Sequence, residues 1–314
     1  MRFTFKQLRY FDAALRYGSI ARAAEEMNIS QSSITAAIDL MEGNIGTALF
    51  RRIPAKGIVP TDTGLEVGRR VVAFLENCRH FESELMSLQG SPTGTLRVAC
   101  FEPTAPYVLP PILKRIAALY PSIRIDLKEG DMQEIANLLK EGGVDMALTY
   151  GVALPQDQPF RSLFFARPFV LIPSDWPLAT RQNLTLHDLA DLPMLMLDLP
   201  ASQSYFNRLF TSQGLRPKVV HTSKSSSVLR AMVAAGLGYT LMNINSRIEN
   251  EHLSGYVARP LLGDLEEPNF GLAYSASNEK STVLQAVLRI SDDLVREGQF
   301  NALELRPNLP PNKH

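Results

Sequence analysis

The sequence predicts a small helical domain at the N-terminus and a larger α/β domain of two lobes, joined by one long helix. Three observations support this prediction. Two short helices with serine caps meet near residue 28, an apolar heptad pattern covers residues 67–88, and β-branched runs alternate with helical stretches from Thr95 to Leu288. A chain of 314 residues is also long enough for more than one domain.

A first helix is predicted over residues 5–17, where Leu8, Phe11 and Leu15 form an apolar stripe. Ser19 and Ser30 are placed to begin the next two helices, because a serine oxygen accepts a hydrogen bond from a free first-turn N–H. These two helices therefore meet in a tight turn around residue 28.

The second of these two helices has an apolar and a polar side. Its apolar side is predicted to face the core and consists of Ile34, Ile38, Met41 and Ile45. Its polar side carries Gln31, Ser32, Thr35, Ala36 and Asp39. A short helix, a tight turn and a second helix with a polar outer row describe a helix-turn-helix, whose second helix enters the major groove of DNA. Two core helices of an ordinary helical domain are the alternative.

A basic hairpin is predicted to follow, with Phe50 and Val59 anchoring its two ends. Its cations would lie over phosphates or reach the minor groove, as in a wing beside the recognition helix. A solvated turn is the alternative for a single basic loop. The candidate DNA-binding residues are Ser30, Gln31, Ser32, Ser33, Thr35, Arg51, Arg52 and Lys56.

One long helix is predicted over residues 62–89, with apolar residues spaced alternately by four and three. This seam consists of Val67, Val71, Phe74, Cys78, Phe81, Leu85 and Leu88. A narrow apolar seam on a long helix requires a partner, and a second copy of the chain is the simplest one. The sequence therefore predicts a homodimer, with Cys78 as a packed apolar residue of the seam.

Beyond a hinge at residues 90–94, strands and helices are expected to alternate, which implies parallel sheets covered by helices. The predicted elements include one strand over Leu163–Ile172 and a helix over residues 243–250. About two hundred residues exceed what one small sheet needs, so we expect two lobes with a ligand-binding cleft between them.

Composition excludes several classes of protein. Lys plus Arg equals Asp plus Glu at 32 each, so DNA affinity must come from local placement of charge. Two cysteines fit a reducing compartment, and no apolar run reaches the ~18 residues of a membrane span, so we expect a cytoplasmic protein. The five histidines have no metal-ligand spacing, and nucleophile and phosphate-loop motifs are missing. We expect no enzyme activity, metal or cofactor.

The N-terminal motifs are Leu8-Arg-Tyr-Phe11, Gly18-Ser19, Ala23-Ala24, Ser30-Gln31-Ser32, Glu42, Gly46, Leu49-Phe50-x-Arg52 and Pro60-Thr61-x-Thr63-Gly64. Together they resemble the DNA-binding signature of LysR-type transcriptional regulators. Later segments agree in order and length, namely Leu109-Pro110, Leu138 to Asp145, Asp175-Trp-Pro-Leu178 and Val233-Ala-Ala-Gly-Leu-Gly238. The resemblance covers nearly the whole chain.

The resemblance implies a winged helix-turn-helix over residues 1–60, a dimerising linker helix over 61–89 and a two-lobed effector domain over 95–300. The effector domain would be similar to type 2 periplasmic binding proteins, with lobe I at 95–161 and 268–300 and lobe II at 162–267. The Pro-rich residues 301–314 are expected to be a disordered tail. Implied partners are promoter DNA, a small-molecule inducer and further copies up to a tetramer, and RNA polymerase is an additional candidate.

The resemblance also implies which residues line the effector cleft: Phe101, Glu102, Thr104, Ser202, Gln203, Ser204, Ser225 and Ser226. Serine-rich helix starts favour an anion, so a small carboxylate is expected. Capping alone would explain each serine equally well, and Glu102 keeps an amine or a neutral ligand open. A thiol sensor at Cys100 is a lesser alternative.

Three positions depart from the family pattern. Ser32 stands where proline is usual, Ala36 where arginine is usual, and Asp39 where a basic residue is common. We therefore expect weaker or narrower DNA recognition that depends on Gln31 and Arg52. Two other functions remain open, a DNA-binding regulator with a vestigial cleft and a small-molecule-binding protein.

Overall fold

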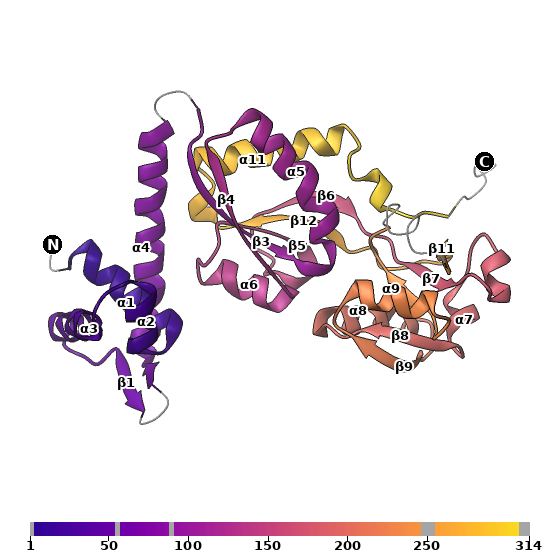
Figure 1. Ribbon diagram of the computed structural model, residues 1–314, viewed down its shortest axis with the longest axis horizontal. Coiled ribbons are helices and arrows are strands. Elements are labelled where there is room, and N and C mark those ends of the chain that lie inside the picture. Colours follow the sequence, from indigo (N-terminus) through magenta and orange to yellow (C-terminus); the bar gives the residue numbers. More distant parts are fainter. Residues whose placement is uncertain (1–2, 54–56, 88–90, 246–254, 308–314) are drawn as a thin grey trace. The chain divides into compact units, whose positions relative to one another are not determined.

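A computed structural model describes residues 3–53, 57–87, 91–245 and 255–307 (Figure 1). The chain forms two compact units that divide between Gly90 and Ser91. Unit 1 contains the N-terminal helices and the long helix, and unit 2 contains the α/β domain.

Unit 1 consists of helices α1 (Phe5–Tyr17), α2 (Ile20–Glu26), α3 (Gln31–Ile45) and α4 (Asp62–Ser87), with the hairpin β1 (Phe50–Ile53) and β2 (Gly57–Pro60) before α4. Side chains of Thr4, Ser19 and Ser30 accept first-turn N–H bonds and so begin α1, α2 and α3. Asn28 has a φ of 51°, a left-handed conformation that makes the turn between α2 and α3 tight.

The core of unit 1 follows the predicted stripes with two exceptions. Phe11, Ile34, Ile38 and Met41 are buried, as predicted. Ile45 is 37% exposed, because α3 ends there and Gly46 turns the chain away, so that Leu49 fills the core instead. In the hairpin, Ile58 is buried and Val59 is 37% exposed, because Ile58 is the β2 residue whose side chain faces the core.

The predicted seam of helix α4 is wrong at its first two positions. Val71 is buried in the core of unit 1 and Val67 packs against that core, so these two residues belong to their own chain's domain. Of the predicted seam, α4 leaves Phe74, Phe81 and Leu85 in water, at 37%, 60% and 48% exposed, and Leu65 outside the seam is 44% exposed. Cys78 is half-buried on the same side of the helix, and Leu88 lies outside the described residues.

Lobe I of unit 2 contains a five-stranded sheet in the order β4-β3-β5-β12-β6. Its strands are β3 (Gly94–Phe101), β4 (Ile123–Gly130), β5 (Met146–Tyr150), β6 (Phe160–Phe165) and β12 (Asn269–Tyr274). Helices α5 (Ala105–Leu119) and α11 (Thr282–Arg296) pack together on one face, and α6 (Met132–Lys140) covers the other (Figure 1).

Lobe II repeats this plan. Its strands are β7 (Phe169–Pro173), β8 (Pro193–Leu197), β9 (Lys218–Ser223), β10 (Thr240–Met242) and β11 (Tyr256–Pro260), and its helices are α7 (Leu186–Leu189), α8 (Pro200–Thr211) and α9 (Ser226–Ala234). Hydrogen bonds from Leu195 N to Tyr239 O (2.7 Å) and from Tyr239 N to Pro193 O (2.9 Å) join β8 to the start of β10. The strand order is therefore β9-β8-β10-β7-β11, equivalent to that of lobe I.

The sheets are mixed, whereas the sequence predicted parallel sheets. Strand β12 is antiparallel to β5 and β6, and β7 is antiparallel to β10 and β11. The reversal arises because the chain crosses between lobes twice and so enters each sheet from both ends. The predicted strand Leu163–Ile172 is also wrong, since it divides into β6 and β7 around the first crossover at residues 166–168, beyond the expected lobe boundary at residue 161.

The predicted disordered tail is wrong for its first seven residues, 301–307. Leu303 and Leu305 pack against the core of unit 2, and Leu303 O accepts a hydrogen bond from Asn245 N at 2.8 Å. Apolar side chains on both sides of Glu304 thus hold this segment against the domain. Residues 308–314 and most of the predicted helix at 243–250 lie outside the described residues.

Replacing Gly64 with alanine is expected to destabilise unit 1 by about 1–3 kcal/mol, the usual cost of overpacking. A Cβ at Gly64 would lie 2.0 Å from the carbonyl oxygen of Leu49. Hydrogen–deuterium exchange of the α1 and α3 amides in the full chain measures the change. Gly43→Ala is the matched control, because a Cβ there meets no described atom within 4 Å. Equal exchange rates in the two variants would contradict this explanation.

Candidate nucleic-acid interface and ligand pocket

The outer face of α3 is exposed and carries few free polar groups. Gln31, Ser32 and Asp39 are exposed, and Ser33 and Thr35 are half-buried. The Ser30 hydroxyl lies 2.8 Å from that of Ser32 and 2.9 Å from that of Ser33, and the Thr35 hydroxyl donates to Gln31 O at 3.1 Å. These hydroxyls therefore shape the start of the helix as well as facing outward.

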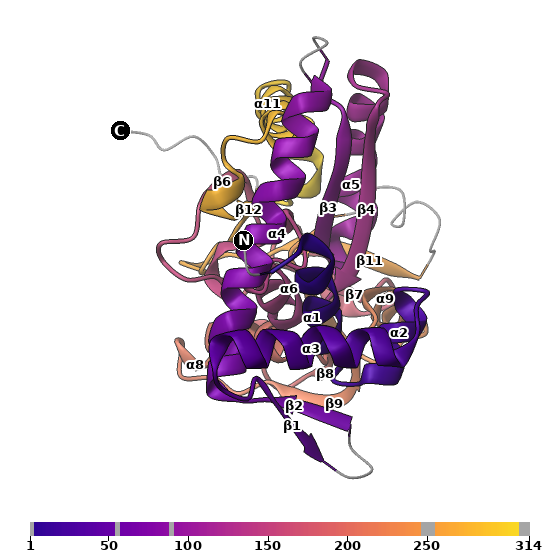
Figure 2. The ribbon, with the colours of Figure 1, turned by 90° about the vertical axis from the view of Figure 1, so that its left-hand side faces the viewer.

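The hairpin lies beside α3 (Figure 2), and Glu42 of that helix fixes it. The Glu42 carboxylate accepts hydrogen bonds from the backbone N–H groups of Leu49 and Phe50, at 2.6 and 3.1 Å. Arg51 and Arg52 of β1 are exposed, and Arg52 Nη2 lies 3.8 Å from Asp39 Oδ1 on α3. Lys56, the third predicted cation of the wing, lies outside the described residues.

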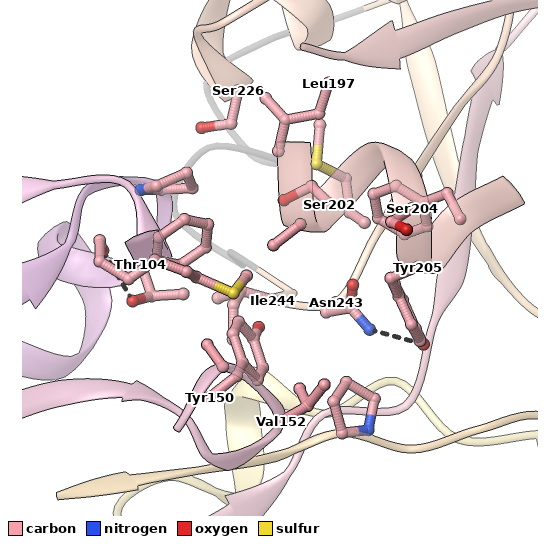
Figure 3. A pocket seen from close by; sticks show the side chains of 18 of the residues that line it. Thr104, Tyr150, Val152, Leu197, Ser202, Ser204, Tyr205, Ser226, Asn243 and Ile244 are labelled. Carbon is pink, nitrogen blue, oxygen red and sulfur yellow. Dashed lines mark hydrogen bonds between the residues drawn. The ribbon is translucent and has the colours of Figure 1, made fainter. Parts of the chain in front are cut away.

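Unit 2 contains a pocket of about 230 Å³ between its lobes (Figure 3). Lobe I contributes Thr104, Tyr150 and Val152, while Ser202 and Ser226 face the same space from α8 and α9. Much of the remaining wall is apolar, including Phe101, Met132, Leu197, Phe206 and Ile244. A second cavity of about 240 Å³ shares Phe101 and Ser202 with the first and extends to Asp131 and Gln133 at the start of α6.

Five of the eight predicted effector residues line this pocket: Phe101, Thr104, Ser202, Ser204 and Ser226. The other three do not line it. Glu102 is exposed, and the pKa of its carboxyl is raised by partial burial and by the negative charge of Glu129. Gln203 donates to Asp198 Oδ1 at 2.6 Å, and Ser225 caps α9 through Val228 N. Capping, the alternative reading of each serine, therefore applies to Ser225.

The pocket residues contributed by core strands and by the segment after β10 were not predicted from the sequence. Tyr150 ends β5, and Asn243 and Ile244 directly follow β10. Arg230, which is 1% exposed, lines the wall from α9 and donates to Ile244 O at 3.1 Å. A buried arginine inside an apolar helical stripe is the signal that could have been noticed.

Several hydroxyl groups in the pocket are free to bind a ligand. Among the described residues, the hydroxyls of Tyr150, Ser202 and Ser226 have no hydrogen-bond partner, and Ser202 is only 5% exposed. In the same described region no side chain caps the first turn of α8, which begins at Pro200. Unpaired N–H groups at a helix start together with a buried hydroxyl favour an oxygen anion.

The pocket wall is bonded directly to the segments that cross between the lobes. Asn243 Nδ2 donates to the Tyr205 hydroxyl at 3.2 Å (Figure 3) and to Ala166 O at 2.7 Å, and the Tyr205 hydroxyl donates to Glu266 O at 2.8 Å. Ala166 belongs to the first crossover, and Glu266 belongs to the second, residues 261–268 between β11 and β12. A ligand that moves Tyr205 or Asn243 would thus act on both crossovers at once.

Cys100 is an inert thiol at the end of β3. It is 0% exposed, and burial raises the pKa of its thiol to about 12. Since only a thiolate reacts readily with oxidants, this environment argues against the thiol-sensor alternative.

The described residues offer neither a metal site nor a membrane span. They contain no group of three His, Cys, Asp or Glu side chains arranged to hold a metal ion. Every helix in the described ranges is too short or too polar to cross a bilayer.

Both units match known protein families. Residues 5–65 match the family described as bacterial regulatory helix-turn-helix protein of the lysR family, and residues 89–295 match the LysR substrate binding domain. The RuBisCO operon transcriptional regulator of Allochromatium vinosum is 28% identical over 248 residues, covering 78% of this chain and 81% of that protein.

Other relatives agree over most of the chain. CysL, a helix-turn-helix transcriptional regulator of Bacillus subtilis, is 23% identical over 295 residues, 88% of this chain and 98% of its own length. The crystal structure of HinK, a LysR family regulator from Pseudomonas aeruginosa, superimposes with a TM-score of 0.61 at 26% identity, covering 93% of this chain and 99% of HinK.

We expect the Cys100 thiol to resist alkylation in the folded protein between pH 7 and 9, because its raised pKa of about 12 keeps it protonated there. Iodoacetamide labelling followed by peptide mass spectrometry measures this. Cys100 should become labelled only when the chain is unfolded in urea. Labelling of Cys100 in the folded protein at pH 8 would show that the thiol is accessible and would revive the sensor alternative.

Proposed function

Because the chain belongs to the LysR family of transcriptional regulators, we propose that it binds promoter DNA as a homodimer and responds to a small carboxylate held between the lobes of unit 2. The observation that supports this most is the pocket, where free hydroxyls and an uncapped helix start face a largely apolar space. We further propose a cytoplasmic location and no enzyme activity, as expected for a regulator whose partner is DNA.

The proposed DNA contacts come from α3 and the hairpin. Gln31 stands exposed at the start of α3, where its amide can bond the two edge atoms of adenine. Arg51 and Arg52 supply positive charge from β1 for the phosphates. The hydroxyls of Ser30, Ser32, Ser33 and Thr35 are proposed to serve mainly in shaping the start of the helix, because they bond one another or the backbone.

The proposed dimer uses the C-terminal part of α4. Phe74, Phe81 and Leu85 stand in water on one side of the helix, with Cys78 between them. Burying an exposed side chain of this size gains about 1.5–3 kcal/mol, so the pairing of two such helices is favourable. A second copy doubles the DNA contacts, which matters for a domain with little excess positive charge. Assembly into a tetramer and contact with RNA polymerase remain proposals from the family alone.

The proposed inducer has an apolar body and one carboxylate. The carboxylate would bond the Ser202 hydroxyl and the first-turn N–H groups of α8, near the positive charge of Arg230. The apolar body would contact Phe101, Leu197 and Ile244. An open cavity of about 230 Å³ favours a ligand-responsive regulator over one whose cleft is filled by side chains.

Phe81→Glu is expected to weaken dimerisation at least about a hundredfold, because it removes apolar contact and places two carboxylates at the interface. Sedimentation equilibrium measures the dissociation constant. Ala73→Glu is the matched control, since Ala73 is exposed on α4 away from the apolar side. A wild-type protein that stays monomeric at micromolar concentration, or equal effects of the two substitutions, would refute the proposed dimer.

Small aromatic and branched aliphatic carboxylates are expected to raise the melting temperature, whereas their amides are not. A ligand at a hundred times its dissociation constant adds about 2.7 kcal/mol of stability. Ser202→Val should reduce the shift, and Ser227→Ala, an exposed α9 serine that does not line the pocket, should leave it intact. A response to amines but not to acids would contradict the proposed ligand class.

A further inference from the structure

The recognition helix α3 has an unusual charge for a helix that faces DNA. Its fifteen residues, Gln31–Ile45, include Asp39 and Glu42 but no lysine, arginine or histidine. Phosphates repel carboxylates, so a DNA-facing helix of this charge lowers affinity unless the carboxylates serve another purpose.

Glu42 has a structural purpose. Its carboxylate accepts the N–H groups of Leu49 and Phe50 and thereby fixes the start of the hairpin, as described above. It therefore presents little free charge to a ligand.

Asp39 has no such purpose in the fold. Its side chain is 59% exposed, on the same face of α3 as Thr35 and Gln31, four and eight residues earlier. Its ion pair is with Arg52 of the hairpin, whose side chain is 69% exposed. An exposed pair of this kind adds about 0–1 kcal/mol to stability, so stability does not explain the carboxylate at this position.

The pair instead affects what the hairpin offers to DNA. While Asp39 holds Arg52 at 3.8 Å, part of the arginine's charge is neutralised at the surface that would approach the phosphates. The free carboxylate oxygen adds repulsion at the same place. Both effects act on every DNA sequence equally, because each acts through the backbone.

We propose that Asp39 is a specificity-determining residue, which restrains Arg52 and keeps affinity for DNA of arbitrary sequence low. This inference rests on the proposed function. Binding then depends on base contacts such as those of Gln31. This assigns a role to the position where the chain departs from the basic residue common in the family.

The test measures binding of the full-length chain to two labelled duplexes by fluorescence anisotropy over a range of salt concentrations. One duplex is selected from a random pool by the wild-type protein, and the other is a scrambled duplex of the same length. The variants are Asp39→Asn, Arg52→Gln and the double substitution. Glu66→Gln is the charge-matched control, because Glu66 lies on α4 and pairs with Arg69 and Arg70.

We expect Asp39→Asn to raise affinity for the scrambled duplex at least fivefold and to reduce the preference for the selected one. The salt dependence should steepen by about 0.9 in the log–log slope for each arginine released to a phosphate. Most of the gain should vanish in the double variant, and Glu66→Gln should produce little of it. Equal melting temperatures of all variants would show that folding is unaffected.

Two outcomes would overturn the inference while sparing the proposed function. In the first, Asp39→Asn leaves scrambled-duplex affinity unchanged. In the second, it weakens only the selected duplex, which would mean that the carboxylate reads a base such as cytosine. If the wild-type protein selects no duplex from the pool, the proposed function itself fails.

Discussion

The exposed apolar side of α4 is the constraint on which the rest of unit 1 depends. One side of this helix completes the core of its own domain through Val71 and Leu75. Another side leaves Phe74, Phe81 and Leu85 in water, an arrangement that a monomeric protein rarely keeps. One continuous helix therefore connects the folding of the DNA-binding domain to the surface that we propose pairs two copies.

In unit 2, side chains of the pocket wall bond to the two segments that cross between the lobes. The hydroxyl of Tyr205 and the amide of Asn243 line the cavity and also bond the two crossovers through Glu266 O and Ala166 O. Glu267 of the second crossover forms ion pairs with Arg167 of the first crossover at 2.5 Å and with Arg306 of the C-terminal segment at 3.0 Å. The lobes are thus held by three segments of the chain, and side chains that line the pocket bond to two of them.

Predictions from the sequence were most accurate for elements that a single apolar repeat or a single helix cap determines. Local chemistry determines the serine caps of α2 and α3, the apolar stripe of α1 that includes Phe11, and the order of strands and helices. The predictions failed where a distant segment decides. Val67 and Val71 fit a seam by spacing, but only the folded domain shows that Val71 lies in the core of unit 1 and that Val67 packs against it. The division of Leu163–Ile172 into two strands likewise depends on the second crossover, since Ala166 N bonds Pro268 O at 2.9 Å.

The pocket residues likewise include some that the sequence predicts and some that it does not. Serines at helix starts could be found from sequence, but Tyr150, Arg230 and Asn243 lie in apolar surroundings that look like core, and only the folded chain shows that they line one pocket. Three further predicted residues do not line the pocket: Ser225 caps α9, Gln203 bonds Asp198, and Glu102 is exposed. Sequence patterns thus locate the elements that border a site better than the side chains that fill it.

The stoichiometry of the protein on DNA tests the central claim most directly. Sedimentation velocity of the full chain, alone and with the duplex that it selects, measures the number of subunits in each species. Pairing through α4 predicts a dimer in the free protein and an even number of subunits on each duplex, with two half-sites separated by whole helical turns. A single subunit bound stably and specifically to one duplex would contradict it.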